Sequence, residues 1–145
     1  EKHNLRRGDV FIIASNSGGN ALVEAMASQV KEIGVVLIAI TSINHATSPS
    51  ARAHGRKIHE LADITLDNLG EVGDASISYP QIVEKTGPTS TVIGAAIINA
   101  AVARAVEIVL ERGVTPKIFS SSNTTAGDVH NNELIATLKR RVHIL

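Results

Sequence analysis

The chain has 145 residues, the length of one domain, and a fold of this size buries about 68–70% of the surface that its unfolded chain exposes. Hydrophobic residues make up 43% of the chain and charged residues 19%, which excludes a disordered protein. Fourteen Lys and Arg residues balance fourteen Asp and Glu residues, and this zero formal net charge disfavours nucleic acid as a partner.

Cysteine is absent, which excludes disulfides, thiolate metal sites and cysteine nucleophiles, and a cytoplasmic location is the expectation. The most apolar stretch, residues 92–106, is interrupted by Asn99 and Arg104. Because it is shorter than the ~20 apolar residues that a membrane span needs, no contact with a membrane is expected.

Residues 10–14 form a continuous apolar run, which predicts a strand buried on both faces of a parallel sheet. A polar loop, residues 15–20, follows this run. Apolar side chains then recur at helical spacing from Leu22 to Ile33, and Gly34 stands where a left-handed C-terminal cap is wanted. The pattern predicts a strand–loop–helix unit.

A second strand is predicted over residues 35–40 and a third, brief strand over residues 64–66. Between them, residues 43–53 are irregular by composition and residues 55–62 favour a short helix. Residues 68–88 have weak periodicity, so we expect a long surface excursion without a predictable conformation.

A long helix is predicted over residues 92–112, and because it is apolar nearly all round, we expect it to be buried against the sheet or in a subunit interface. Residues 117–120 favour a last strand, and residues 131–142 favour a last amphipathic helix. The predicted fold class is α/β, an open parallel sheet with flanking helices, with residues 1–145 forming a single domain.

Each predicted strand finishes in small hydroxyl or amide residues. These endings are Ser15-Asn16-Ser17, Thr41-Ser42, Asp67-Asn68 and Ser120-Ser121-Ser122-Asn123. Ligands of open α/β sheets bind in the crevice at the carboxyl ends of the strands. We therefore expect a crevice lined by neutral hydrogen-bonding groups.

The loop of residues 15–20 lies between a predicted strand and a predicted helix, where backbone N–H groups and the helix dipole favour an anion. The hydroxyls of Ser15 and Ser17 add donors, and Gly18 and Gly19 allow a close backbone approach. The loop has neither the Walker pattern nor G-x-G-x-x-G, so a single phosphate monoester fits better than a nucleotide. The alternative is a loop that only caps the helix.

The run Gly-Asp-Val-Phe-Ile-Ile-Ala-Ser-Asn-Ser-Gly at residues 8–18, together with residues 35–42 and 60–64, resembles the core of the SIS (sugar isomerase) domain. Residues 86–95 and 123–131 are similar to an uncharacterised SIS subgroup that resembles the phosphoheptose isomerases. The resemblance covers nearly the whole chain.

This resemblance implies a flavodoxin-like parallel sheet, a homodimer or higher oligomer, and a bound phosphorylated sugar. Separately, we expect no cofactor and no metal. It also implies an earlier strand–loop–helix unit of the family that this chain lacks, so that the chain is the C-terminal portion of the domain. The phosphate and substrate ligands are then expected at the strand ends and at the start of the long helix: Ser15, Asn16, Ser17, Gly18, Asn20, Thr41, Ser42, Ser90 and Thr91.

Aldose–ketose isomerisation needs a base for the proton between adjacent carbons and an acid for the carbonyl oxygen. Phosphoheptose isomerases place a glutamate in the earlier unit and a histidine on the final family helix, but residues 92–109 contain no histidine. The remaining catalytic candidates are His45, just past a strand end, and His130, whose tautomer Asp128 could fix. The alternatives are a loop histidine without a role and a helix cap formed by Asp128 or Asn131.

Two functions therefore stay open for a phosphosugar-binding SIS domain. One is an aldose–ketose sugar-phosphate isomerase, and the other is a non-catalytic sugar-phosphate sensor or regulatory module, which the base-poor crevice favours. A metal pair is not expected, because His54 and His59 are five residues apart and do not share a helix face.

Overall fold

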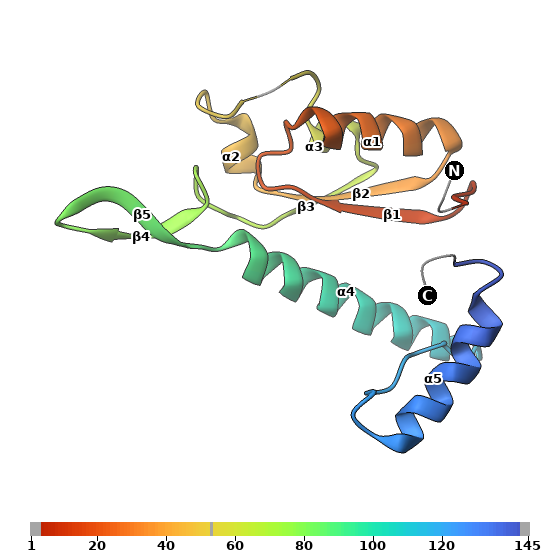
Figure 1. Cartoon of the computed structure of the whole chain (residues 1–145). Helices are drawn as coiled ribbons and strands as arrows, with labels where there is room; N and C mark the ends of the chain where they lie inside the picture. The colour runs from red at the N-terminus through yellow and green to blue at the C-terminus, as the bar shows by residue number, and fades with distance from the viewer. Residues whose placement is uncertain (1–3, 53, 143–145) are drawn as a thin grey trace. The chain divides into compact units, whose positions relative to one another are not determined.

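The computed structural model describes residues 4–52 and 54–142 (Figure 1). These residues form two compact units. The first, here called the sheet unit, spans Leu5–Ala100, and the second, the C-terminal unit, contains Asn4 and the described residues from Ala101 onward.

Three parallel strands form the sheet of the sheet unit (Figure 1). They are β1 (Val10–Ala14), β2 (Val36–Thr41) and β3 (Ile64–Asp67), in the order β1-β2-β3. The register pairs Val10 with Val36 and Ala14 with Ile40, so the carboxyl ends of β1 and β2 lie side by side. Helices flank this open parallel sheet, which confirms the predicted α/β fold class.

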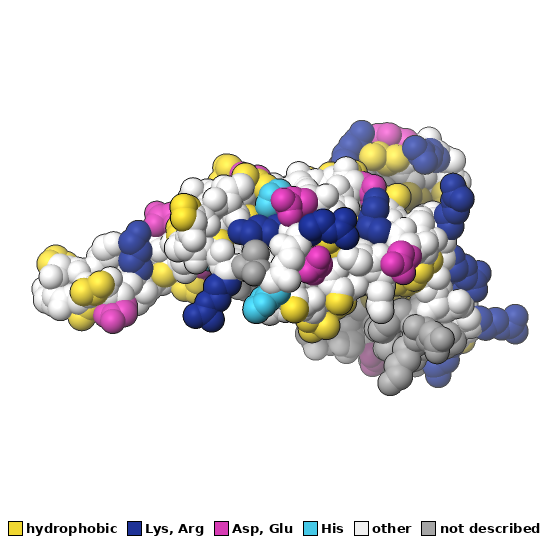
Figure 2. Space-filling view, turned by 90° about the horizontal axis from the view of Figure 1, so that it is seen from above, with side chains coloured by type: hydrophobic (Ala, Val, Ile, Leu, Met, Phe, Trp, Pro, Cys, Tyr) yellow, Lys and Arg dark blue, Asp and Glu magenta, His cyan; other side chains and the backbone are white. Residues whose placement is uncertain are grey.

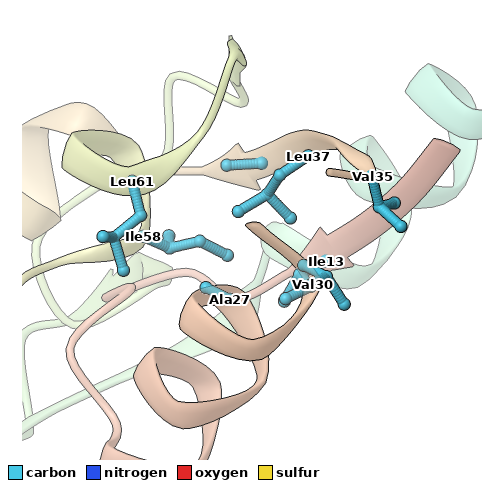
Figure 3. Close-up of a cluster of buried hydrophobic side chains, with 8 residues drawn as sticks. Ile13, Ala27, Val30, Val35, Leu37, Ile58 and Leu61 are labelled. Carbon is cyan, nitrogen blue, oxygen red and sulfur yellow. The ribbon is translucent and has the colours of Figure 1, made fainter. Parts of the chain in front are cut away.

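Two helices cover one face of the sheet, α1 (Ala21–Ile33) and α3 (Ile58–Leu61) (Figure 1). Asn20 caps the N-terminus of α1, and its side chain accepts the N–H of Leu22. Gly34 caps the C-terminus with φ of 84°. A left-handed residue at this place favours glycine, as the sequence predicts. Figure 3 shows how side chains from β1, α1, β2 and α3 point toward one another in the core, among them Ile13, Ala27, Val30, Leu37, Ile58 and Leu61.

Two segments of the sheet unit differ from the expectation. A short helix, α2 (Ile43–Thr47), replaces the predicted irregular segment, because the Ser42 side chain accepts the N–H of His45 and so caps its first turn. The excursion of residues 68–88 contains an antiparallel hairpin of β4 (Ala75–Tyr79) and β5 (Ile82–Pro88).

Helix α4 (Ser90–Glu111) forms where a long helix is predicted, but the expected burial against the sheet is wrong. Within the described part of the chain, Gly94 is its buried residue, whereas Val92 is 70% exposed and Val102 is 53% exposed. Burial in a subunit interface stays a prediction.

The length of α4 also corrects the expectation, drawn from residues 92–106, that this stretch is too short to span a membrane. The helix has 22 residues and an 18-residue window with a mean hydropathy of 1.9, so by length and composition alone it is long and apolar enough to cross a membrane. The core helix of a soluble protein meets the same criterion. That the protein makes no contact with a membrane therefore stays a prediction.

The predicted strand at residues 117–120 is wrong, because no strand forms there among the described residues. The Asn131 side chain holds both backbone groups of Ser120, accepting its N–H at 2.9 Å and donating to its carbonyl at 2.9 Å. These groups are therefore not free for a sheet partner.

The last helix, α5 (Thr125–Leu138), begins earlier than the predicted residue 131. The Thr124 hydroxyl accepts the N–H of Gly127 at 3.1 Å and caps the first turn. A side chain at this place satisfies a helix N–H that would otherwise have no partner.

Candidate functional site

A cavity of about 160 Å³ opens at the carboxyl ends of the parallel strands, within the sheet unit. The residues that line it come from the ends of β1, β2 and β3 and from the start of α4: Ala14, Ser15, Asn16, Ile40, Asn68, Ser90, Thr91 and Gly94. Open α/β sheets bind their ligands at this edge.

Two amide side chains join the ends of β1 and β3 across the cavity. The Asn16 side-chain oxygen accepts a hydrogen bond from Asn68 Nδ2 at 3.0 Å. Asn68 is only 4% exposed, and its own side-chain oxygen accepts the N–H of Gly70 at 2.9 Å. This pairing determines which donor and acceptor atoms of each amide remain available to a ligand.

Thr41 is the last residue of β2 and Ser42 follows it; both are fully buried, outside the lining of the cavity. The Thr41 hydroxyl donates to the backbone carbonyl of Asn16 at 3.0 Å. The Ser42 hydroxyl donates to the carbonyl of Gly70 at 2.7 Å and accepts the N–H of His45 at 3.0 Å. In this structure both hydroxyls hold the surrounding loops in place.

In the loop between β1 and α1, some residues line the cavity and others pack against the core or cap the helix. Ser15 lines the cavity, while Ser17, Gly18 and Asn20 do not. Gly18 has φ of +63°, and a Cβ there would lie 2.7 Å from Ile58 Cγ2, so it needs to be glycine for its conformation and its packing. Asn20 caps α1.

The first residues of α4, Ser90 and Thr91, also line the cavity, and the carboxylate of Asp74 holds the start of this helix. It accepts the N–H of Thr89 at 3.1 Å, the N–H of Ser90 at 2.8 Å and the hydroxyl of Ser90 at 2.6 Å. Burial raises the pKa of Asp74, but the hydrogen bonds from Ser90 and Thr89 outweigh it and leave the pKa below its ordinary value.

His45 lies on α2, behind the lining residue Asn16. Its Nδ1 accepts the N–H of Gly73 at 3.3 Å and lies 3.5 Å from Asn16 Nδ2. Since Nδ1 is an acceptor, Nε2 carries the proton of the neutral ring.

The other two catalytic candidates lie on α5 in the C-terminal unit. His130 Nε2 donates to the carbonyl of Ile118 at 2.9 Å, and Asp128 stands in the first turn of the helix. The cavity lies wholly in the sheet unit. A catalytic role for these two residues stays a prediction.

The lining of the cavity contains no titratable side chain. In the ranges 4–52 and 54–142, no group of three or more His, Cys, Asp or Glu side chains could hold a metal ion. Charged side chains of both signs are interspersed on the face drawn in Figure 2. The residues that line the cavity therefore offer hydrogen bonds and no fixed charge of their own.

Sequence reasoning placed Asn68 at a strand end in the expected crevice without naming it as a ligand residue, and it missed Asp74. Asp74 could not be predicted, because it caps a helix sixteen residues further along the chain and lies where no conformation could be assigned.

A comparison with family models finds a match at the start of the chain, over residues 1–42. These residues are similar to the family described as the SIS domain. The match spans β1, the following loop, α1 and β2, and it confirms the resemblance to the SIS domain.

Along its length the chain is similar to proteins named UPF0309. It is 39% identical over 142 residues to a UPF0309 protein of Geobacillus kaustophilus, covering 97% of this chain and 57% of the relative. It is 38% identical over 146 residues to one of Geobacillus thermodenitrificans, covering 100% of this chain and 59% of the relative. A relative in Shouchella clausii is 33% identical over 146 residues, covering 100% and 59%. The chain thus spans less than three fifths of these relatives.

Proposed function

We propose that the cavity at the strand ends binds a phosphorylated sugar. The observation that carries this proposal is the neutral lining, in which Ser15, Asn16, Asn68, Ser90 and Thr91 surround a volume of about 160 Å³ in a chain whose residues 1–42 are similar to the SIS domain. Hydroxyl and amide groups are the hydrogen-bonding partners that the hydroxyls and the phosphoryl oxygens of such a ligand need.

Ser15 is the donor best placed for the phosphoryl group. Its hydroxyl has no hydrogen-bond partner among the residues that the structure describes, although it lines the cavity. A hydrogen bond to a charged group contributes about 1.5–3 kcal/mol, roughly a tenfold to hundredfold gain in affinity.

The substitutions Ser15→Ala and Ser17→Ala test this placement as a matched pair in one loop. A hexose 6-phosphate should raise the melting temperature of the wild-type protein by mass action. Ser15→Ala is expected to remove most of this shift and Ser17→Ala to leave it intact, as measured by differential scanning fluorimetry. The reverse pattern would place the ligand at the loop before α1 and exclude the cavity.

A second candidate function is aldose–ketose isomerisation of the bound sugar phosphate. It is favoured by the position of His45, which lies 3.5 Å from the lining residue Asn16 and is a side chain of the type that moves protons at neutral pH. The absence of titratable side chains from the lining favours the alternative, a non-catalytic sensor.

Solvent isotope exchange separates these two functions. An isomerase would incorporate deuterium from D₂O at C1 or C2 of the sugar phosphate, and His45→Gln is expected to stop this exchange while the ligand-induced melting shift persists. A wild-type protein that shifts its melting temperature but incorporates no deuterium is a sensor, and the isomerase proposal then fails.

The remaining expectations are part of the same proposal. We place the protein in the cytoplasm, as one SIS-type domain over residues 1–145 that associates with a second copy of itself. The exposed apolar side chains of α4, among them Val92, Val102 and Leu110, supply a surface for that association.

A further inference from the structure

Asp74 lies outside the lining of the cavity but controls one of its polar groups. Its carboxylate receives the hydroxyl of Ser90 on Oδ2 at 2.6 Å and two backbone N–H groups, those of Thr89 and Ser90, on Oδ1. A hydroxyl has one hydrogen to donate. Because the Ser90 hydroxyl gives that hydrogen to Asp74, it can offer a ligand in the cavity only its lone pairs.

The same carboxylate makes this end of the cavity unsuitable for an anion. The first turn of a helix carries partial positive charge that favours a phosphoryl group. At α4 a carboxylate already takes the N–H groups of Thr89 and Ser90, so the helix end is neutralised. A phosphoryl group at Ser90 would face both an acceptor oxygen and a negative charge.

The chain holds Asp74 firmly in this position. Asp74 has φ of 73°, a left-handed conformation that is uncommon outside glycine, and the preceding Gly73 has φ of 85°. Gly73 donates its N–H to His45 Nδ1 at 3.3 Å, which anchors the loop from the opposite side. The carboxylate is therefore fixed before a ligand arrives.

We propose that Asp74 is a positioning residue that sets the orientation of the ligand: it makes Ser90 an acceptor for a sugar hydroxyl and so directs the phosphoryl group to the Ser15 end of the cavity. The inference rests on the proposed function, because it needs a phosphorylated sugar in the cavity. It assigns the two ends of the cavity to different parts of one ligand.

The substitution Asp74→Asn inverts the polarity of Ser90 with little change of shape. Asparagine tolerates the left-handed conformation, and its side-chain oxygen can keep the two backbone N–H groups. Its Nδ2 then faces the Ser90 oxygen and donates to it, so the Ser90 hydrogen is released toward the cavity. The variant loses an acceptor for a sugar hydroxyl and gains a donor for phosphate.

The experiment measures the dissociation constants of glucose 6-phosphate and of inorganic phosphate by calorimetry on the same protein. In Asp74→Asn, the preference for glucose 6-phosphate over inorganic phosphate is expected to fall by about threefold to tenfold. Ser90→Ala removes the acceptor and should lower the preference similarly, which keeps the test open if Asp74→Asn does not fold. Glu71→Gln is the matched control, since it removes a negative charge from the same loop and its ion-pair partner is Lys85.

The possible results distinguish failure of the role given to Asp74 from failure of the proposed sugar-phosphate binding. A wild-type protein that binds neither compound overturns both the proposed function and the role of Asp74. If the wild type binds and neither Asp74→Asn nor Ser90→Ala changes the preference, only the role of Asp74 is overturned. An equal change in Glu71→Gln also overturns it, because charge and not the Ser90 hydrogen bond would then set the preference.

Discussion

Asp63 joins three parts of the sheet unit through one carboxylate. It accepts the backbone N–H of Leu37 on β2 at 2.8 Å and forms an ion pair with Lys31 on α1, while the residue itself stands just before β3. The hydrogen bond from Lys31, followed by that from Leu37, holds the pKa of Asp63 below its ordinary value of 3.8. The charged form of Asp63 therefore stabilises the folded chain.

This shift predicts how stability depends on pH. A carboxylate with a lowered folded-state pKa stabilises the fold above its unfolded value, and that stabilisation is lost as the pH falls through the folded value. Asp63→Asn should lower the melting temperature at pH 7 and flatten the loss of stability below pH 3.8. Thermal unfolding between pH 7 and pH 2 measures both effects.

Glu84→Gln is the control for the loss of one exposed carboxylate, because Glu84 is exposed on the hairpin strand β5. It should follow the wild-type curve. A parallel decline of wild type and Asp63→Asn in acid would contradict the role given to Asp63.

At the scale of elements, what the sequence predicts well is determined locally. The strand at residues 10–14 is an uninterrupted apolar run and forms with these bounds. Helix α1 is amphipathic and is capped by a glycine with positive φ. Residues close together in the sequence therefore determine both its buried face and its C-terminal end. Ser15, Asn16, Ser90 and Thr91 were predicted at element ends and do line one cavity.

The elements that sequence reasoning missed depend on contacts between distant residues. Residues 117–120 are apolar enough for a strand, but Asn131 takes the backbone groups of Ser120. The start of α4 depends on Asp74, which no local pattern connects with that helix. Thr41 and Ser42 were predicted as ligands because of their place at a strand end; the folded chain shows that both are fully buried, and their role in binding stays a prediction.

At the scale of the whole molecule, the strand-end cavity has two chemically different ends. The likeness to the SIS domain comes from the match at residues 1–42, while the relatives extend well beyond the part that this chain covers. The cavity itself is formed by residues of the sheet unit alone. We propose that its neutral lining and the carboxylate behind Ser90 give a ligand one preferred orientation.

A crystal structure of the protein with bound glucose 6-phosphate tests this claim most directly. We expect the phosphoryl group within hydrogen-bond distance of the Ser15 hydroxyl and a sugar hydroxyl donating to Ser90. A phosphoryl group bound at Ser90, or a ligand held at residues 17–20 with the strand-end cavity empty, would contradict it.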